Sequence, residues 1–381
     1  MNLRKRYRQI AALAFAAFLT GCGNDIPSVP EDSGMEGTGN VTLSLNIALS
    51  ESGIGAKTRA PFPDSDDLTF EGPVSDYEKL RTLRVVIVHA GEEKTGVVEH
   101  NRMVLVEPST GAILNDDLRF KVSSGERKHI YLFANEAAVS YDFSSIAEGE
   151  LFPKTEVESI RLSRKSNASL VDNSASSVEK SFIPMSEMFE IDVPVPESPV
   201  DFFRTEHLFV TRSAIKFSFH FSVAEDYPSE GVSVTGIKLY GLADECYYLP
   251  RNTMYDPGKY AVSGNPSGGR FITAFETPAD TPFSDYMFAP VSPIEIKPGM
   301  EATLSPYVYF PESKQDGQKH FRLSVALDNG TELLTPRDLT LDEIPRNTHV
   351  KINIEMKSTD AKASVTLLPY TGISLEPDFG L

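Results

Sequence analysis

Apolar and polar residues alternate along several separate segments of the chain. The alternation is clearest in residues 118–122, 215–223, 321–327 and 350–356. Successive side chains of a strand point to opposite faces of the sheet, so this pattern predicts antiparallel strands with one buried and one solvated face. Two continuous apolar runs, Val85–Val88 and Ile130–Phe133, predict central strands. The hydrophobic pattern therefore predicts a protein built mainly from short strands.

Turn-forming residues separate these segments, whereas helical patterning is scarce. Asp328-Asn329-Gly330-Thr331 predicts a hairpin turn, and Ser267-Gly268-Gly269 predicts a loop. Only residues 155–164 and 141–148 suggest helices, and both are short. Many short strands joined by turns are typical of β-sandwiches, so the predicted fold class is all-β.

The chain length and one proline-rich stretch predict the domain organisation. At about 150 residues per domain, 381 residues correspond to two domains. The stretch Val193–Pro199 is a poor strand interior, because proline supplies no backbone donor to a sheet. It predicts a connector between two domains of similar size, over residues 60–200 and 201–381.

The first 22 residues have the pattern of an export signal. Basic residues precede an apolar run, Ile10–Leu19, which is shorter than the roughly 20 residues that cross a bilayer. The run ends in Leu19-Thr20-Gly21-Cys22, which resembles a bacterial lipoprotein signal with Cys22 as the lipidation site. Residues 23–59 then form a tether and a first strand. The alternative is a plain secretory peptide that contains a cysteine by chance.

Both ends of the chain carry an apolar stripe with the period of a strand. The N-terminal stripe consists of Val41, Leu43, Leu45, Ile47 and Leu49. In the C-terminal stripe every second residue from Ala363 onward is apolar, except Thr371. This stripe includes Ile373, Leu375, Phe379 and Leu381. Termini usually fray into polar sequence, so an apolar stripe there indicates burial in a groove. The groove can belong to its own domain or to another molecule.

A small, glycine-containing segment follows the first strand and includes Arg59-Ala60. Exposed segments of this kind are preferred sites of proteolysis, and a cut after Arg59 would detach the strand Val41–Leu49. The apolar side chains of that strand represent roughly 8–15 kcal/mol of burial, comparable with the stability of a domain. The vacated groove then needs a replacement strand, and the C-terminal stripe of another copy has the right period. Alternatively, both stripes are ordinary edge strands of their own domains.

A series of short motifs runs through the whole chain. It begins with Cys22, the strand Val41–Leu49 and Thr58-Arg59-Ala60. It continues with Phe182–Ser186, Leu208–Lys216, Ile344–Val350, Leu368–Tyr370 and Asp378–Leu381. In their order and spacing these motifs resemble the Bacteroidetes fimbrillins, the two-domain subunits of type V pili.

The resemblance implies two transthyretin-like β-sandwich domains in tandem and a structural role in a fimbrium. It implies export to the outer membrane as a lipoprotein, cleavage between Arg59 and Ala60 by an arginine-specific protease, and polymerisation by donor-strand exchange at the cell surface. The implied partners are other pilus subunits, in a homo- or hetero-polymer. The strand Val41–Leu49 is then removable, and Ile373, Leu375, Phe379 and Leu381 belong to the donor strand. Stalk and tip positions both stay open.

The sequence carries no signal for catalysis or for a cofactor. It lacks the metal-protease, nucleophile-elbow, phosphate-loop and CxxC motifs, so we expect no enzyme, no cofactor and no metal. The acidic run Asp64–Asp67 lacks the EF-hand glycine and glutamate, which favours a solvated loop over a calcium site. Cys246 is expected to be a small buried residue. The net charge of −18 argues against nucleic acid, which needs a basic face.

A second class of function is left open by the residues. A monomeric surface lipoprotein, or a tip adhesin, would bind a glycan or a host protein through exposed aromatic side chains. The candidates are Tyr240, Tyr247, Tyr248, Tyr255 and Tyr260. Tyrosines at this spacing are also typical of sandwich packing, and the chain has no tryptophan for a sugar platform. Polymerisation instead requires a cleavable strand and an apolar tail, both of which the sequence contains.

Overall fold

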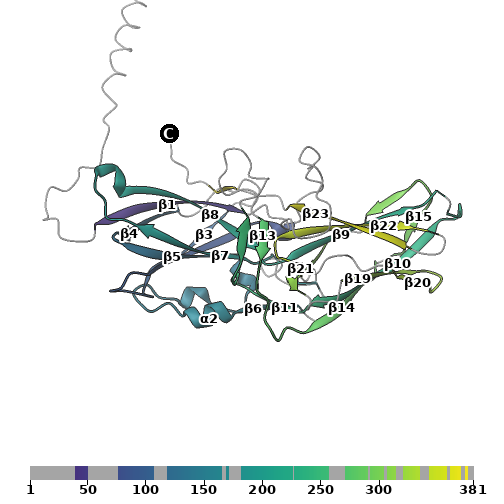
Figure 1. Cartoon of the computed structure of the whole chain (residues 1–381), viewed down its shortest axis with the longest axis horizontal. Coiled ribbons are helices and arrows are strands. Elements are labelled where there is room, and N and C mark those ends of the chain that lie inside the picture. The colour runs from purple at the N-terminus through teal and green to yellow at the C-terminus, as the bar shows by residue number, and fades with distance from the viewer. Residues whose placement is uncertain are drawn as a thin grey trace, which may run out of the picture. The chain divides into compact units, whose positions relative to one another are not determined.

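The structure is a computed structural model, and strands dominate it (Figure 1). It describes residues 39–49, 76–106, 118–164, 169–170, 182–225, 227–256, 271–290, 292–303, 307–314, 321–334, 343–357, 361–369 and 374–375. Within these ranges the helical elements are α2 (Lys154–Ser159) and short 3-10 turns. None of the described helices is long and apolar enough to cross a membrane. The prediction of an all-β protein is confirmed.

The N-terminal half of the chain forms one large sheet that folds over on itself. Its strands are β1 (Asn40–Leu49), β2 (Thr82–His89), β3 (Val98–Leu105), β4 (Arg119–Ser123), β5 (Glu126–Ala134), β7 (Met185–Val193), β8 (Phe203–Arg212) and β24 (Ser374–Leu375). The order is β24-β1-β8-β7-β5-β2-β3, with β4 also paired to β1. Side chains of β1 and β2 share one core, which strands so far apart in a flat sheet could not do. The sheet therefore bends at β8 into the two layers of a sandwich.

A second core covers the outer face of β2 and β5. Val86, Val88, Tyr131 and Phe133 point away from the sandwich interior and pack against α2 and β6 (Arg161–Ser163) and β11 (Glu245–Tyr247). Both faces of β2 and β5 are therefore buried. This confirms the prediction that the continuous runs Val85–Val88 and Ile130–Phe133 form central strands.

The C-terminal half forms two further sheets around a core of its own. One sheet contains β9 (Ile215–Val223), β16 (Glu301–Thr303), β17 (Val308–Phe310), β22 (Thr348–Met356) and β23 (Ala361–Pro369). The other contains β10 (Val232–Ala243), β14 (Phe283–Phe288), β15 (Ile294–Ile296), β19 (Arg322–Leu327) and β20 (Glu332–Leu334). The alternating apolar residues of β9, β19 and β22 all point into the shared core. Alternation in the sequence thus located the strands of this sandwich correctly.

Two short pairs complete the described strands, and the chain departs from the predicted helix at one point. The pairs are β12 (Met254–Asp256) with β13 (Phe271–Ala274), and β18 (Ser313–Lys314) with β21 (Glu343–Ile344). The helix predicted over residues 155–164 ends at Ser159, because Arg161–Ser163 pair with β11. The helix predicted over residues 141–148 is a single 3-10 turn, Phe143–Ser145. The predicted hairpin turn joins β19 to β20, with Gly330 at a φ of 80°.

The change from the first sheet to the next occurs after the proline-rich stretch. That stretch leads into the 3-10 turn η5 (Pro199–Phe202) and then into β8, which pairs with β1 and β7. Residues 203–212 therefore belong by their hydrogen bonds to the N-terminal sheet, and the first strand of the next sheet begins at Ile215. The division into domains 60–200 and 201–381 stays a prediction. The change from one sheet to the next lies about a dozen residues after residue 200, between β8 and β9.

Candidate functional site: the β1 channel

The strand β1 buries its apolar side chains completely in the N-terminal core. Val41, Leu43, Leu45 and Ile47 have relative exposures of 0–1%. They contact core side chains from both layers of the sandwich, including those of β2, β4 and β5. The period-two stripe read from the sequence is therefore a core stripe. We call the space that these side chains fill the β1 channel.

Backbone pairing also places β1 inside the sheet, not at its edge. On one side it runs parallel to β8, from Thr42 beside Phe203 to Leu49 beside Val210. On the other side it pairs antiparallel with β4 over residues 40–44 and with β24 at Ile47 and Ala48 (Figure 1). Removal of β1 would leave β8 and β4 without a partner between them. The interpretation of β1 as an ordinary edge strand is therefore incompatible with its pairing.

The burial of β1 is large compared with the stability of a domain. The four described core side chains represent about 6–12 kcal/mol of gross burial, at 1.5–3 kcal/mol each. A typical domain is stable by only about 5–15 kcal/mol. Loss of β1 would therefore remove burial comparable with the whole stability of such a domain, so a chain without β1 would need another strand in that place.

The face of β1 opposite the apolar stripe carries polar side chains whose hydrogen bonding is incomplete. Ser44 Oγ and Asn46 Oδ1 are buried and have no hydrogen-bond partner within the described part of the chain. A buried polar atom without a partner costs roughly 1–3 kcal/mol. These atoms lower the stability with which β1 holds its place, while the apolar stripe opposite raises it. A strand with the same stripe and no orphaned polar atoms would bind more tightly in the channel.

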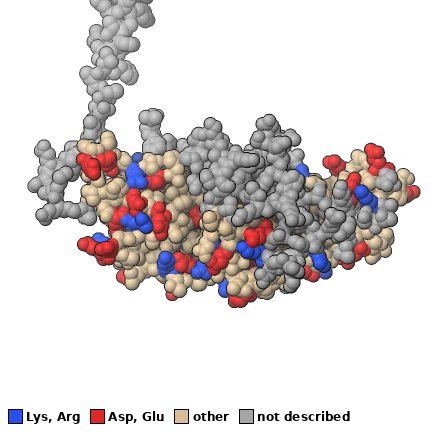
Figure 2. All heavy atoms as spheres, in the orientation of Figure 1, with Lys and Arg blue, Asp and Glu red and all other residues tan. Residues whose placement is uncertain are grey.

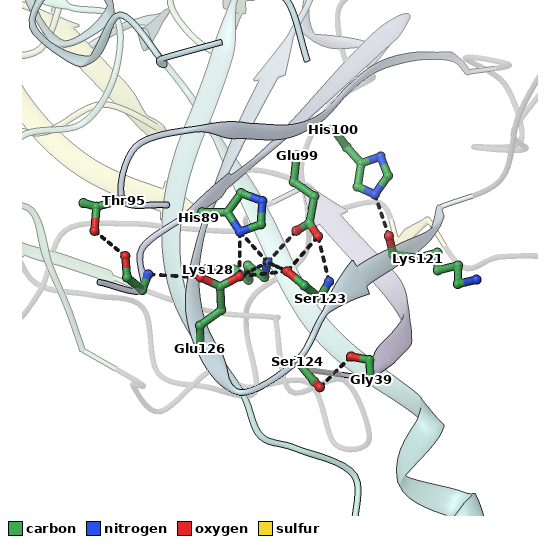
Figure 3. A network of polar contacts seen from close by, with 11 residues as sticks. Gly39, His89, Thr95, Glu99, His100, Lys121, Ser123, Ser124, Glu126 and Lys128 are labelled. Carbon is green, nitrogen blue, oxygen red and sulfur yellow. Dashed lines mark hydrogen bonds and ion pairs between the residues drawn. The ribbon is translucent and has the colours of Figure 1, made fainter. Parts of the chain in front are cut away.

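A buried ionic cluster lies behind the start of β1 (Figure 3). Lys128, which is completely buried, donates hydrogen bonds of 2.6 Å to Glu99 Oε2, 2.6 Å to Glu126 Oε1 and 2.7 Å to Ser123 Oγ. His89 Nδ1 lies 2.5 Å from Glu126 Oε1. Burial alone would raise the pKa of Glu126, but hydrogen bonds from Lys128, His89 and Ser123 lower it to about 2. The carboxylate of Glu126 therefore stays ionised at neutral pH.

The ionic cluster fixes the hairpin that holds β1. Glu99 Oε1 also accepts a hydrogen bond from the backbone N–H of Ser123, at 2.7 Å. The next residue, Ser124, donates from its Oγ (2.6 Å) and its N–H (3.0 Å) to the carbonyl of Gly39, just before β1. The hairpin between β4 and β5 is thus anchored to β3 by side chains that β1 does not supply. This anchoring holds one wall of the β1 channel independently of β1.

A second polar feature lies where three of the sequence motifs meet. We call it the polar junction; it consists of Arg212, Ser213, Glu312, Arg346 and Asn347 with the carbonyls of Tyr247 and Tyr248. Arg346, at 0% exposure, donates to Glu312 Oε2 at 3.0 Å, to Glu312 Oε1 at 2.6 Å and to the Tyr248 carbonyl at 2.7 Å. Its Nη2 also donates to the Tyr247 carbonyl. All three guanidinium nitrogens of Arg346 therefore donate hydrogen bonds to buried acceptors.

The polar junction brings together three of the motifs quoted from the sequence. Ser213 donates its N–H to the Pro184 carbonyl at 2.9 Å, and Asn347 donates its N–H to the Ala214 carbonyl at 2.8 Å. Asn347 has a left-handed backbone (φ 58°), which asparagine adopts more readily than most residues. The motifs Phe182–Ser186, Leu208–Lys216 and Ile344–Val350 thus form one structural unit. Sequence analysis grouped them without a physical reason.

Several predicted site residues lie outside the described ranges. These are Cys22, Arg59, Ala60, Ile373, Phe379, Leu381 and the acidic run Asp64–Asp67. Leu49 belongs to β1 by its backbone, and Leu375 belongs to β24, where it pairs with Ile47. The lipidation site, the cleavage site and the donor strand therefore stay predictions.

Three of the residues considered for other chemistry, Cys246, Tyr247 and Tyr248, are buried. Cys246 is completely buried, and burial raises the pKa of its thiol to about 12, so it is the inert residue that the sequence indicated. Tyr248 is fully buried and Tyr247 is 8% exposed, as expected for packing. Within the described ranges no group of three or more His, Cys, Asp or Glu residues is placed to hold a metal ion.

Surface charges in the described part are largely interspersed. Figure 2 shows Lys and Arg side chains next to Asp and Glu over the visible face. Arg127, for example, lies 3.3 Å from Glu190 and 3.0 Å from Asp192, on exposed parts of β5 and β7. A face of mixed charge does not offer the continuous basic surface that a phosphate backbone needs.

Comparison with known proteins gives structural neighbours only. No family model matches the chain, and no curated protein matches it. A tip fimbrial protein of Porphyromonas gingivalis, solved with a C-terminal truncation, has 11% identity and a TM-score of 0.46, over 87% of this chain and 100% of that one. A fimbrilin of the same species has 13% identity and a TM-score of 0.42, over 86% and 98%. The structural neighbours include fimbrial proteins and putative cell adhesion proteins of Bacteroidetes.

A third similar structure is a fimbrial assembly protein of Parabacteroides distasonis, with 11% identity and a TM-score of 0.41, over 87% of this chain and 99% of that one. All three TM-scores lie below 0.5, so the likeness by itself assigns no function. The function of this chain has to be argued from its own residues.

Proposed function

We propose that this protein is a structural subunit of a fimbrium whose first strand is exchanged for a strand of another subunit. In this proposal the chain is exported as a lipoprotein through Cys22 and cut after Arg59. The cut releases β1 together with the lipid, and the β1 channel is refilled by the C-terminal stripe of a neighbouring subunit. The product is a polymer on the cell surface, and the protein is not an enzyme.

The observation that carries the proposal is the position of β1. It is an interior strand with four completely buried side chains, and it lies just N-terminal to the predicted cleavage site. An interior strand that proteolysis can detach is otherwise a liability, because its loss destabilises the whole sandwich. Strand exchange accounts for both features, since the vacated channel provides the energy for assembly.

Two further observations support the proposal that a second strand replaces β1 in the channel. The ionic cluster around Lys128 anchors β4 to neighbours other than β1, so one channel wall is held when β1 is absent. The orphaned atoms Ser44 Oγ and Asn46 Oδ1 make β1 a less than optimal occupant. The first observation keeps one channel wall in place for a new strand, and the second lowers the stability of the original strand in the channel.

Donation by the C-terminal stripe rests on its period. Ile373, Leu375, Phe379 and Leu381 share one parity, as do Val41, Leu43, Leu45 and Ile47. A strand with period-two apolar residues fits the channel irrespective of the identity of the residues between them. The partner is therefore another copy of this chain or a related subunit with the same stripe.

The substitution Arg59→Ala tests the proposal, with Lys57→Ala as the matched control. Arg59→Ala removes the predicted cut, so the variant should stay full-length, lipid-bound and monomeric. Lys57→Ala removes a neighbouring positive charge but keeps the cut, so it should assemble as the natural chain does. Membrane fractionation and electron microscopy of cell-surface fibres measure both properties. Normal fibres formed by the Arg59→Ala variant would contradict the proposal.

A further inference from the structure

Four strongly exposed apolar side chains gather at one end of the N-terminal sandwich. Val195, Val200, Phe202 and Phe203 have relative exposures of 53%, 76%, 40% and 64%. They belong to the connector between β7 and β8 and to the first residue of β8. Contiguous exposed apolar side chains of this size typically mark an interaction surface, and aromatic residues are enriched in such surfaces. We call this set the 195–203 patch.

Local hydrogen bonds hold the 195–203 patch in a fixed shape. The carboxylate of Asp201 accepts hydrogen bonds from the N–H (2.8 Å) and the Oγ (2.8 Å) of Ser198 and from the N–H of Glu197 (3.2 Å). The bonds from Ser198 lower the pKa of Asp201, so its carboxylate stays ionised at neutral pH. The turn η5 is therefore preformed, with Val200 and Phe202 held outward.

The 195–203 patch is continuous with the mouth of the β1 channel. A cavity of about 420 Å³ opens between them. It is lined by the apolar residues Val41, Val193, Pro194, Val195, Val200 and Phe203 and by the charged residues Glu197, Asp201 and Arg204. A Cβ built on Gly39, just before β1, would lie 3.6 Å from the ring of Phe202. The start of β1 thus leaves the sandwich directly beside the patch.

The direction of β1 determines what emerges at this end. β1 runs parallel to β8, so its N-terminal end lies beside Phe203 and its C-terminal end beside Val210. Parallel and antiparallel ladders have different hydrogen-bond patterns, so a replacement keeps the bonds of β8 and β4 unchanged only if it runs in the same direction. The N-terminal end of the replacement then lies beside Phe203.

The C-terminal stripe is joined to the rest of its own subunit through its N-terminal end. A stripe inserted in the direction of β1 therefore places its subunit at the Phe203 end of the channel, over the 195–203 patch. Insertion in the opposite direction would place that subunit at the Val210 end, away from the patch. The exposed apolar residues are found at the first of these two ends.

We propose that the 195–203 patch is the docking surface for the body of the donating subunit, a second copy of this chain whose strand enters the β1 channel in the direction of β1. The proposal rests on the strand exchange proposed above and adds to it a direction and a second contact. The patch contributes to assembly through apolar contact, while the channel binds the strand itself.

The test separates the two contacts. The double variant Val200→Ser/Phe203→Thr removes the apolar patch from exposed positions, with β-compatible threonine in β8. The matched control, Met254→Ser/Phe283→Thr, alters two other exposed apolar residues, at 62% and 47% exposure. Each full-length chain is purified and cut by an arginine-specific protease. Three quantities are then measured. The first two are the melting temperature before the cut and the melting temperature after the cut in the presence of a synthetic peptide of residues 371–381. The third is the rate of polymer formation without the peptide.

The expected result is a split between the readouts. The patch variant should melt like the natural chain before the cut and gain the same stabilisation from the peptide. Its polymerisation should slow about tenfold or more, because central aromatic contacts carry much of the energy of an interface. The control variant should polymerise at the natural rate.

Two outcomes would overturn the patch proposal alone. The first is peptide binding together with polymerisation of the patch variant at the natural rate. The second is a lowered melting temperature of the uncut patch variant with normal polymerisation, which would show that the patch is covered by the chain itself. If the peptide stabilises none of the cut chains, strand exchange fails and the patch proposal fails with it.

Discussion

The β1 channel and the polar junction are both buried, but different interactions stabilise them. In the channel, β1 is held by apolar burial and by a backbone ladder, and two of its polar atoms find no hydrogen-bond partner among the described residues. In the junction, Arg346 is held by directed bonds to Glu312 and to two carbonyls. Apolar burial depends on size and period, whereas a buried charge depends on particular partners.

This difference indicates which part of the molecule can be exchanged. A strand with a period-two apolar stripe of suitable size can take the place of β1. Apolar burial depends on side-chain size and spacing, and the backbone ladder does not depend on the side chains. No segment can replace the loop around Arg346 without leaving Glu312 buried and unpaired. The chain thus combines a strand held by apolar burial with a framework held by directed hydrogen bonds, which is the combination that the proposed strand exchange requires.

Breaking the polar junction should have the largest effect. Arg346→Leu leaves the carboxylate of Glu312, at 1% exposure, without its cation. We expect the free energy of unfolding to fall by about 3–5 kcal/mol, measured by chemical denaturation of the uncut chain. Arg127→Leu is the control, because its ion pairs are exposed and should contribute less than about 1 kcal/mol. A loss for Arg346→Leu no larger than for Arg127→Leu would show that the junction is not a fixed framework.

A substitution in β1 should affect the precursor and not the assembled subunit. Leu45→Ala creates a cavity in the N-terminal core, so the uncut chain should lose about 2–5 kcal/mol of unfolding free energy. After the cut and refilling of the channel, Leu45 is gone, and polymers should melt as natural ones do. Leu132→Ala is the control, since β5 remains in both states and both should be destabilised. Destabilised Leu45→Ala polymers would show that β1 stays in place.

The face of β22 that points away from the C-terminal core offers a pH test that the β1 channel should not share. Burial first, and then the charges of Lys216, His220 and Lys351, lower the pKa of His349 to about 3. An unfolded histidine has a pKa of about 6.5, so between these values only the unfolded chain binds the proton. The stabilisation from neutral His349 is therefore present above about pH 6.5 and is lost as the pH falls, by up to about 1.4 kcal/mol per unit.

His349→Gln should weaken this pH dependence. Between pH 6.5 and pH 5 the natural chain should lose about 2 kcal/mol more unfolding free energy than the variant. Denaturation curves at both values measure the difference, and His207→Gln, at an exposed position of β8, is the control that should behave as the natural chain. An equal pH dependence in the two variants would refute the role of buried His349.

The smallest expected effect is a gain in stability. Ser44→Ala removes a buried hydroxyl that has no partner among the residues that the structure describes, so the uncut chain should become more stable by about 1 kcal/mol. A better seated β1 should also leave the channel more slowly after the cut, which would delay polymerisation. A loss of stability would show that Ser44 makes a favourable interaction within the folded precursor.

The strands could be predicted from the sequence where each one has a single pattern of burial. β9 and β22 alternate because one face is in the core, and Val85–Val88 is continuous because cores cover both faces of β2. The end of α2 could not be predicted, because Arg161–Ser163 pair with β11, which lies more than 80 residues further along the chain. That pairing overrides the local pattern.

The candidate site was predicted in part. The stripe of β1 was visible because its signal is periodic, but its interior position between β8 and β4 depends on pairings across the chain. The polar junction gave no local signal, because arginine and glutamate are normally exposed, and only distant residues explain the burial of Arg346 and Glu312. The 195–203 patch was interpreted only as a connector.

The central claim is that the C-terminal stripe serves another subunit and not its own, and deletion of residues 371–381 tests it most directly. In the described residues this segment contributes only the pairing of Ser374 and Leu375 with β1. We predict that the uncut, truncated chain melts within about 2 °C of the natural one and that it no longer polymerises after the cut. A melting temperature lowered by many degrees would show that the stripe is core of its own domain and would contradict the account.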